Sequence, residues 1–143
     1  MGDLAVESYK KSVATVVDRW EKKSRPVAEA IDKINVELKK LQANKTPTAE
    51  EKAKIDSCIA NRTKLKAQLE NFGNELRINL MVITPPEKNK ANEKDMIQLP
   101  KALEDIVKKK GISIGSVTIK PDIGIDLKSF KFKKAGIILE VKF

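Results

Sequence analysis

The sequence has 143 residues, of which 41% are hydrophobic, 34% charged and only 4% aromatic, and its formal net charge is +9. This length allows one domain, or a helical part and a small second one, and the high charged fraction suits long solvated helices. With no histidine and a single cysteine, the composition excludes Ser–His and Cys–His nucleophile pairs, His-ligated metals and thiolate zinc clusters. We therefore expect a protein that is not an enzyme and has no cofactor.

Residues 4–43 carry an apolar residue at every third or fourth position, a pattern that predicts a helix with an apolar seam along one side. The seam consists of Val6, Tyr9, Val13, Val16, Trp20, Val27, Ile31, Ile34, Leu38 and Leu41. Its phase slips near Pro26, and a proline clashes with the preceding helical turn. The segment is therefore either one helix kinked at Pro26 or two helices, at about 5–23 and 26–43.

A turn at 44–47 separates this segment from a second predicted helix at about 48–82. Thr48 and Glu51 form the capping box that marks a helix start. The heptad pattern continues through Ile55, Cys58, Arg62, Leu65, Leu69, Phe72 and Leu76. A buried Arg62 needs a partner such as Asp32 or Glu29; the favoured expectation is that its head group reaches water. Gly73 indicates either a weak point in the helix or a close approach of another segment.

The simplest arrangement of residues 1–83 is a long antiparallel helical hairpin, with a three-helix bundle folded at Pro26 as the alternative. The apolar stripe widens toward the N-terminal end, which predicts contacts there with the C-terminal part or with another subunit. The candidate partner contacts are Tyr9, Val13, Val17, Trp20, Phe130 and Phe132. Cys58 lies on the seam, where we expect a small buried apolar residue.

Residues 84–98 read as a polar linker, because a stretch so rich in charge buries too little apolar area to order itself. The remaining part, 99–143, is predicted to be a small domain with a short helix and an antiparallel sheet. Leu99-Pro100 opens the helix and Gly111 ends it. Apolar and polar residues then alternate as in a sheet with one wet face, interrupted by predicted turns at 121–122 and 134–136. The fold class is therefore α+β, with three or four short strands.

The final strand is expected either inside the sheet or at an edge, where a partner strand could pair with it. All basic residues in 84–143 are lysines, and the candidate polyanion contacts are Lys108, Lys109, Lys110, Lys131, Lys133 and Lys134. Bidentate recognition of phosphates and bases usually relies on arginine. Solubility is therefore the favoured explanation for these lysines, with non-specific binding to nucleic acid as the second.

The order of elements resembles that of the Gre transcript-cleavage factors, which carry functional acidic residues at the hairpin tip. Here the tip, 44–47, has none, and Glu50 and Glu51 lie beyond it. The main hypothesis is a protein-interaction or assembly module with a protein partner or a homo-oligomer. The alternatives are a basic nucleic-acid-binding protein and a toxin or effector component whose hairpin recognises a target. No apolar run long enough to span a membrane and no secretory signal is apparent, so the cytoplasm is expected, with signal-less export left open.

Overall fold

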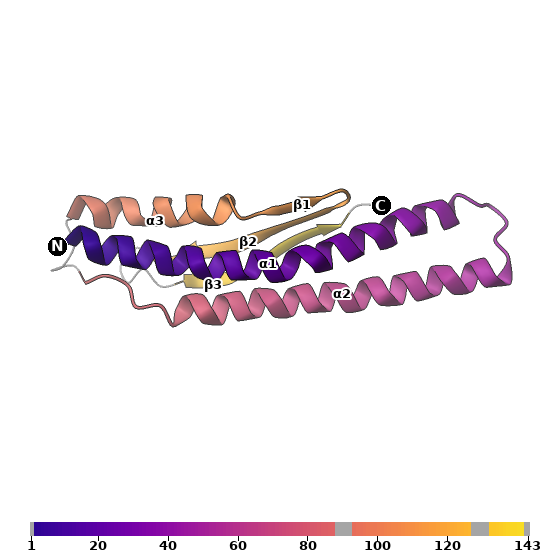
Figure 1. Cartoon of the computed structure of the whole chain (residues 1–143), viewed down its shortest axis with the longest axis horizontal. Helices are drawn as coiled ribbons and strands as arrows, with labels where there is room; N and C mark the ends of the chain where they lie inside the picture. Colours follow the sequence, from indigo (N-terminus) through magenta and orange to yellow (C-terminus); the bar gives the residue numbers. More distant parts are fainter. Residues whose placement is uncertain (1, 88–92, 127–131, 142–143) are drawn as a thin grey trace.

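The computed structural model describes residues 2–87, 93–126 and 132–141, and in these residues it has three helices and a three-stranded antiparallel sheet (Figure 1). The helices are α1 (Gly2–Gln42), α2 (Ala49–Met81) and α3 (Glu93–Lys108). The strands are β1 (Ile112–Ile114), β2 (Val117–Ile125) and β3 (Phe132–Val141). The predicted α+β class is confirmed.

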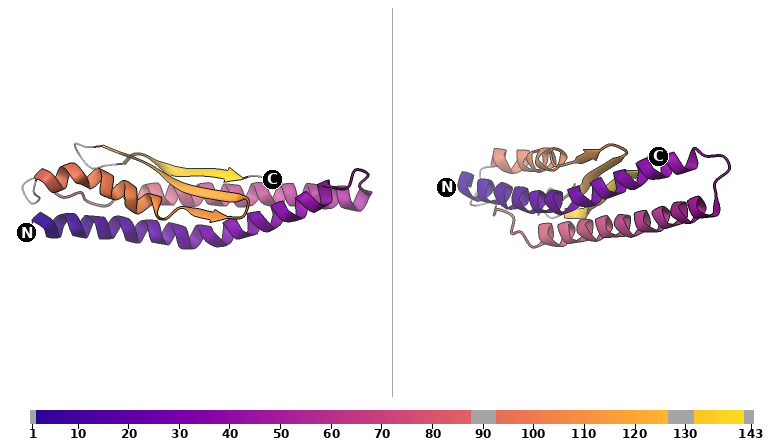
Figure 2. Two further views of the ribbon diagram at one scale, coloured as in Figure 1. Left: turned by 90° about the horizontal axis from the view of Figure 1, so that it is seen from above. Right: turned by 45° about the vertical axis from the view of Figure 1, so that its right-hand side comes forward.

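Helix α1 continues through Pro26 as one element. Of the alternatives that the sequence left open, two separate helices and a three-helix bundle folded at Pro26 are therefore wrong. The side chain of Pro26 is exposed, which leaves the buried side of the helix undisturbed. Figure 2 shows that α1 changes direction near its middle, as expected of a helix with an internal proline.

The start of α2 is fixed by the predicted capping box. The hydroxyl of Thr48 accepts a hydrogen bond from the backbone N of Glu51 at 3.2 Å, and Oε1 of Glu51 accepts one from the backbone N of Thr48 at 3.5 Å. The Asn44 side-chain amide also donates to Oε2 of Glu51 at 2.9 Å. This bond is the largest cause of the lowered pKa of the Glu51 carboxyl. The turn between the two long helices is therefore held by side chains on both of its ends.

Helices α1 and α2 lie side by side and run in opposite directions (Figures 1 and 2). Polar contacts cross the pair: Lys23 Nζ lies 3.2 Å from Glu75 Oε2, and Arg62 Nη1 donates to Asn35 Oδ1 at 3.0 Å. Cys58 is a buried free cysteine, as the seam predicts, and burial raises the pKa of its thiol.

Helix α3 begins at Glu93, so the prediction of a polar linker was wrong for residues 93–98. Pro100 lies inside this helix instead of opening it. The buried stripe of α3 starts at Met96 and continues through Leu99, Leu103 and Val107. Glu93 and Asp95 occupy the first turn, where acidic side chains interact favourably with the helix dipole. The charged residues that looked like a linker are therefore partly the start of an amphipathic helix.

The sheet has the order β1-β2-β3, and both pairs are antiparallel. Pro121 and Asp122 were predicted to form a turn but lie inside β2, opposite Ile137 and Gly136 of β3. The turn predicted at 134–136 is likewise wrong, because these residues lie within β3. β1 begins at Ile112, opposite Ile119, so Pro121 occupies the half of β2 that β1 does not reach. A proline is tolerated in a strand where one side has no neighbouring strand to receive its missing N–H.

The sheet packs on the helix pair, and the two predicted parts of the chain share one core. Buried residues of α1, α2, α3 and all three strands belong to a single hydrophobic cluster. β3 lies over α2 at Gly73, where an added Cβ would come within 2.9 Å of Cγ2 of Ile137. Of the two explanations for Gly73, the close approach of another segment is the correct one. The part of the helix pair nearer the 43–48 turn extends beyond the sheet (Figure 1).

Candidate functional site

The residues predicted to contact a partner lie in the core of the chain itself. Tyr9, Val13, Val17, Trp20 and Phe132 are at most 5% exposed and belong to the common hydrophobic cluster. Burial raises the pKa of Tyr9 to about 12. Phe130 lies outside the described residues. The wide end of the seam therefore makes its contacts with the C-terminal part, which is one of the two outcomes that the sequence suggested.

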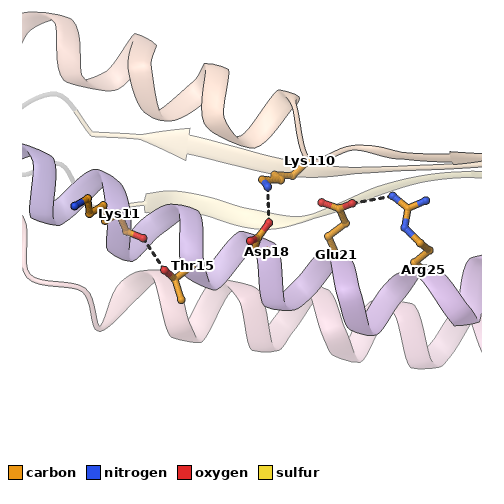
Figure 3. Close-up of polar contacts among 6 residues, drawn as sticks. All are labelled: Lys11, Thr15, Asp18, Glu21, Arg25 and Lys110. Carbon is orange, nitrogen blue, oxygen red and sulfur yellow. Dashed lines mark hydrogen bonds and ion pairs between the residues drawn. The ribbon is translucent and has the colours of Figure 1, made fainter.

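The lysine run at the end of α3 is partly engaged in ion pairs. Lys108 Nζ lies 3.0 Å from Glu104 Oε1, and the Lys110 ammonium donates to Asp18 of α1 (Figure 3). The hydrogen bond with Lys110 lowers the pKa of Asp18, and the same bond raises the pKa of Lys110. Lys109 is exposed. Lys131 lies outside the described residues, and only the backbone of Lys133 and Lys134, in β3, is described.

Local bonds also order the exposed side of α1 on either side of this pair. The Thr15 hydroxyl donates to the carbonyl of Lys11 at 2.9 Å, and Arg25 Nη2 lies 2.8 Å from Glu21 Oε1 (Figure 3). Lys110 therefore approaches a helix face whose charges are already partly paired. This arrangement favours docking of α3 onto α1 over a free cationic surface made by the complete lysine run.

A chain of polar side chains, which the sequence did not predict, ties the β1–β2 turn to both long helices. Asp32 Oδ1 accepts hydrogen bonds from the backbone N and the hydroxyl of Ser116, at 2.9 and 3.0 Å. Asn35 Nδ2 donates to the Ser116 hydroxyl at 2.7 Å, and Asn35 Oδ1 accepts from Arg62. Burial lowers the pKa of the Arg62 guanidinium. Arg62 is partly exposed, so its head group can still reach water, and its printed hydrogen bond goes to Asn35, a residue that the sequence did not suggest as a partner.

This polar chain sets the orientation of the sheet on the helices. Asn35 is only 3% exposed, and its amide joins a group on α2 to a group in the β1–β2 turn. Gly115, next to Ser116 in this turn, has φ +53°, in the left-handed region that favours glycine. Gly115 therefore provides the backbone conformation of the turn, and the hydrogen bonds of Ser116 with Asp32 and Asn35 hold the turn against α1.

The surface that stands out is an exposed apolar face at the end of α2. Ile78, Met81 and Val82 are 61%, 54% and 73% exposed. Spacings of three and four residues put them on one side of the helix, opposite the buried Leu76 and Leu80. We call these three residues the α2 apolar face. The sequence signal was present, because they are apolar residues that fall outside the seam.

A groove lies near the same end of the molecule, between the first turns of α1 and the segment that follows α2. Its volume is about 430 Å³, and it is lined by Ala5, Ser8, Tyr9, Ser12, Ile83, Thr84, Pro85, Pro86 and Glu87. Hydroxyl groups and proline rings dominate this lining. This lining offers a binding surface at this end of the molecule.

Other chemical features are sparse in the part of the chain that the structure describes. Residues 2–87, 93–126 and 132–141 contain no group of three or more Cys, Asp or Glu side chains placed to hold a metal ion. Among the described helices, none has the length and apolarity needed to cross a membrane. Comparison of the chain with protein-family models, with curated proteins and with solved structures finds no match.

Proposed function

We propose that the chain is a non-enzymatic protein–protein interaction or assembly module. The paired helices serve as a rigid arm, and a partner docks at the end that carries the sheet. The observation that carries this proposal is the α2 apolar face, where three large side chains on one side of a helix are each more than half exposed. Large contiguous apolar surfaces are uncommon on proteins that act alone, and they usually mark sites of interaction.

The position of this face supports the proposal. It lies on the last turns of α2, a helix whose other side is held in the core by Leu69, Leu76 and Leu80. A partner would therefore meet a surface that is already fixed in place, which lowers the entropic cost of binding. The adjacent groove beside Tyr9 gives that partner polar groups within reach of the same end.

Site-specific photo-cross-linking in the source cells tests this proposal. A photoreactive residue at Val82 should give a discrete adduct with another protein, whereas the same residue at Val36, an exposed valine on α1, should not. Val36 is a matched control because it is also an exposed valine, 50% exposed, and lies on the other long helix. Substituting serine for Ile78 and Met81 should abolish the adduct at Val82. Equal labelling at the two positions, or none at Val82, would contradict the proposal.

A further inference from the structure

β3 forms a long open edge of the sheet. It has ten residues, and in the described part of the chain its one neighbouring strand is β2. In an antiparallel ladder alternate residues direct their N–H and C=O groups to opposite sides, so β3 presents a row of backbone donors and acceptors away from β2. Figure 2 shows β3 as the outer margin of the sheet, with α2 beneath the sheet instead of beside it.

We propose that a second copy of this chain pairs with β3 through this edge, in antiparallel orientation and with the two-fold axis at Ile137. The inference deepens the proposed function, on which it rests, by naming a partner for the sheet. The pairing joins the two sheets into one that continues across both copies. The backbone groups on the open edge of each β3 then hydrogen-bond to the other copy.

The charge pattern of β3 selects a second copy as the occupant. With Ile137 opposite itself, position 134 of one strand faces position 140 of the other, which sets a lysine opposite a glutamate twice per dimer. Opposite charges at directly facing positions stabilise an antiparallel pair, and like charges destabilise it. The strand is therefore complementary to its own reversed copy.

Neighbouring registers lose this complementarity. Centring the pair on Gly136 places position 134 opposite Ile138, and centring it on Ile138 places Glu140 opposite Gly136. In a register that sets even-numbered residues of one strand opposite odd-numbered residues of the other, the core face of one copy would be turned toward solvent. In the register centred on Ile137, Ile138, which is 48% exposed, faces Gly136, so a large apolar side chain meets a position without one.

Helix α2 adds a second complementary pair beneath the sheet. Ile137 packs at Gly73, so the axis at Ile137 passes close to this point of α2. Glu70 and Arg77 are both exposed and flank Gly73 by three and four residues. Helical periodicity puts both of them on the side opposite Phe72 and Asn79, which face α1. The two-fold operation therefore brings Glu70 of each copy toward Arg77 of the other.

Sedimentation equilibrium of the full chain and of two charge-reversal variants tests this inference. The unmodified chain should show a monomer–dimer equilibrium. Lys134→Glu and Glu140→Lys should each raise the dissociation constant by at least about tenfold, because each sets like charges opposite one another twice per dimer. A 1:1 mixture of the two variants should restore dimers, since each facing pair then has one lysine and one glutamate. The double variant K134E/E140K should restore them as well.

Net charge does not account for this pattern. The formal charge of +9 becomes +7 in Lys134→Glu and +11 in Glu140→Lys, so an effect of total charge would move the two variants in opposite directions. Lys54→Glu, an exposed lysine on α2 far from β3, is the control with the same charge change and should dimerise like the unmodified chain. Circular dichroism checks that every variant is folded.

A chain that sediments as a monomer at every concentration overturns the inference, and so does a dimer that neither variant weakens or that the mixture does not restore. Failure of the proposed function is distinguishable, because it is read from cross-linking at Val82 on the opposite side of α2. A monomer that still gives the adduct at Val82 removes the β3 dimer and leaves the interaction module in place.

Discussion

Asp32 and Ser116 are 84 residues apart in the chain, yet one carboxylate oxygen of Asp32 accepts hydrogen bonds from both the backbone N and the hydroxyl of Ser116. The contact fixes the β1–β2 turn against α1 and leaves little space at the neighbouring Gly115. A Cβ added there would overlap the Asp32 carboxylate, and the φ of +53° would strain any other side-chain-bearing residue.

Gly115→Ala is therefore expected to lower the free energy of unfolding by about 2–5 kcal/mol, from backbone strain and overpacking together. Gly111→Ala is the control, since a Cβ at Gly111 comes no closer than 3.5 Å to any heavy atom, which is ordinary van der Waals contact. It should leave stability unchanged or raise it by up to about 1 kcal/mol, because alanine restricts the unfolded chain. Urea denaturation of both variants measures the difference. Equal stability of the two variants would contradict the close contact between the β1–β2 turn and Asp32.

Gly73→Ala tests the close packing of β3 on α2. Alanine should stabilise the helix by about 1 kcal/mol, but its Cβ would come within 2.9 Å of Cγ2 of Ile137. We expect the overlap to cancel or exceed the gain, so the variant should be as stable as the original chain or less stable. In an Ile137→Ala background the same change should become stabilising by about 1 kcal/mol. A helix gain of the same size in both backgrounds would rule out the contact.

Ser24 offers a way to stabilise the protein. Its side chain is fully buried in α1, and its hydroxyl makes no hydrogen bond among the described residues. Because a buried hydroxyl without a partner costs free energy, Ser24→Ala should raise the free energy of unfolding by about 1–3 kcal/mol. Ser12→Ala, at an exposed position of the same helix, reports the gain in helix propensity alone. In thermal unfolding, Ser24→Ala should be clearly more stable than Ser12→Ala. The reverse order of stability would contradict the prediction.

The ion pair between Asp18 and Lys110 predicts a dependence of stability on pH. The pKa of Asp18 is lowered from its ordinary value of 3.8, so its stabilising contribution is present above that value and is lost as pH falls through the lowered pKa. The pKa of Lys110 is raised from its ordinary value of 10.5, so its contribution is present below that value and is lost as pH rises through the raised pKa. The pair therefore stabilises the fold between these limits.

Asp18→Asn should remove this contribution. The difference in unfolding free energy between the original chain and Asp18→Asn should be constant near neutral pH, and it should shrink at the acid end and again at the alkaline end. It should also shrink as salt is added, because both groups are accessible to solvent. Lys108→Gln, which breaks the more exposed pair with Glu104, is the matched control and should change stability less. A difference that does not vary with pH would argue against the pair.

The sequence predicted local features better than distant ones. The capping box of Thr48 and Glu51 is confirmed. It could be predicted because its two partners are three residues apart and share one helix turn. The phase slip at Pro26 was real, but packing of α1 on both sides of the proline keeps one helix continuous. Pro121 and Gly136 were misread as turns because the same residue types occur in strands where a neighbouring strand is absent or a side chain is not needed.

The candidate site was harder to predict for a physical reason. The seam pattern correctly marked Tyr9 and Trp20 as apolar contacts, but it does not distinguish a partner from the chain's own C-terminal part. The hydrogen bonds of Asn35 join three elements, and no local pattern encodes them. Ile78, Met81 and Val82 were visible as apolar residues outside the seam, but their exposure depends on which side of α2 the sheet occupies.

The common core has a consequence for the order in which the protein folds during synthesis. The helix pair is built from neighbouring segments and can form early, whereas the common core that contains Tyr9 and Trp20 is complete only when α3 and the strands have emerged from the ribosome. A nascent chain that ends after α2 therefore exposes the wide apolar end of α1. We expect such a chain to be the species that is most prone to aggregate or to recruit chaperones.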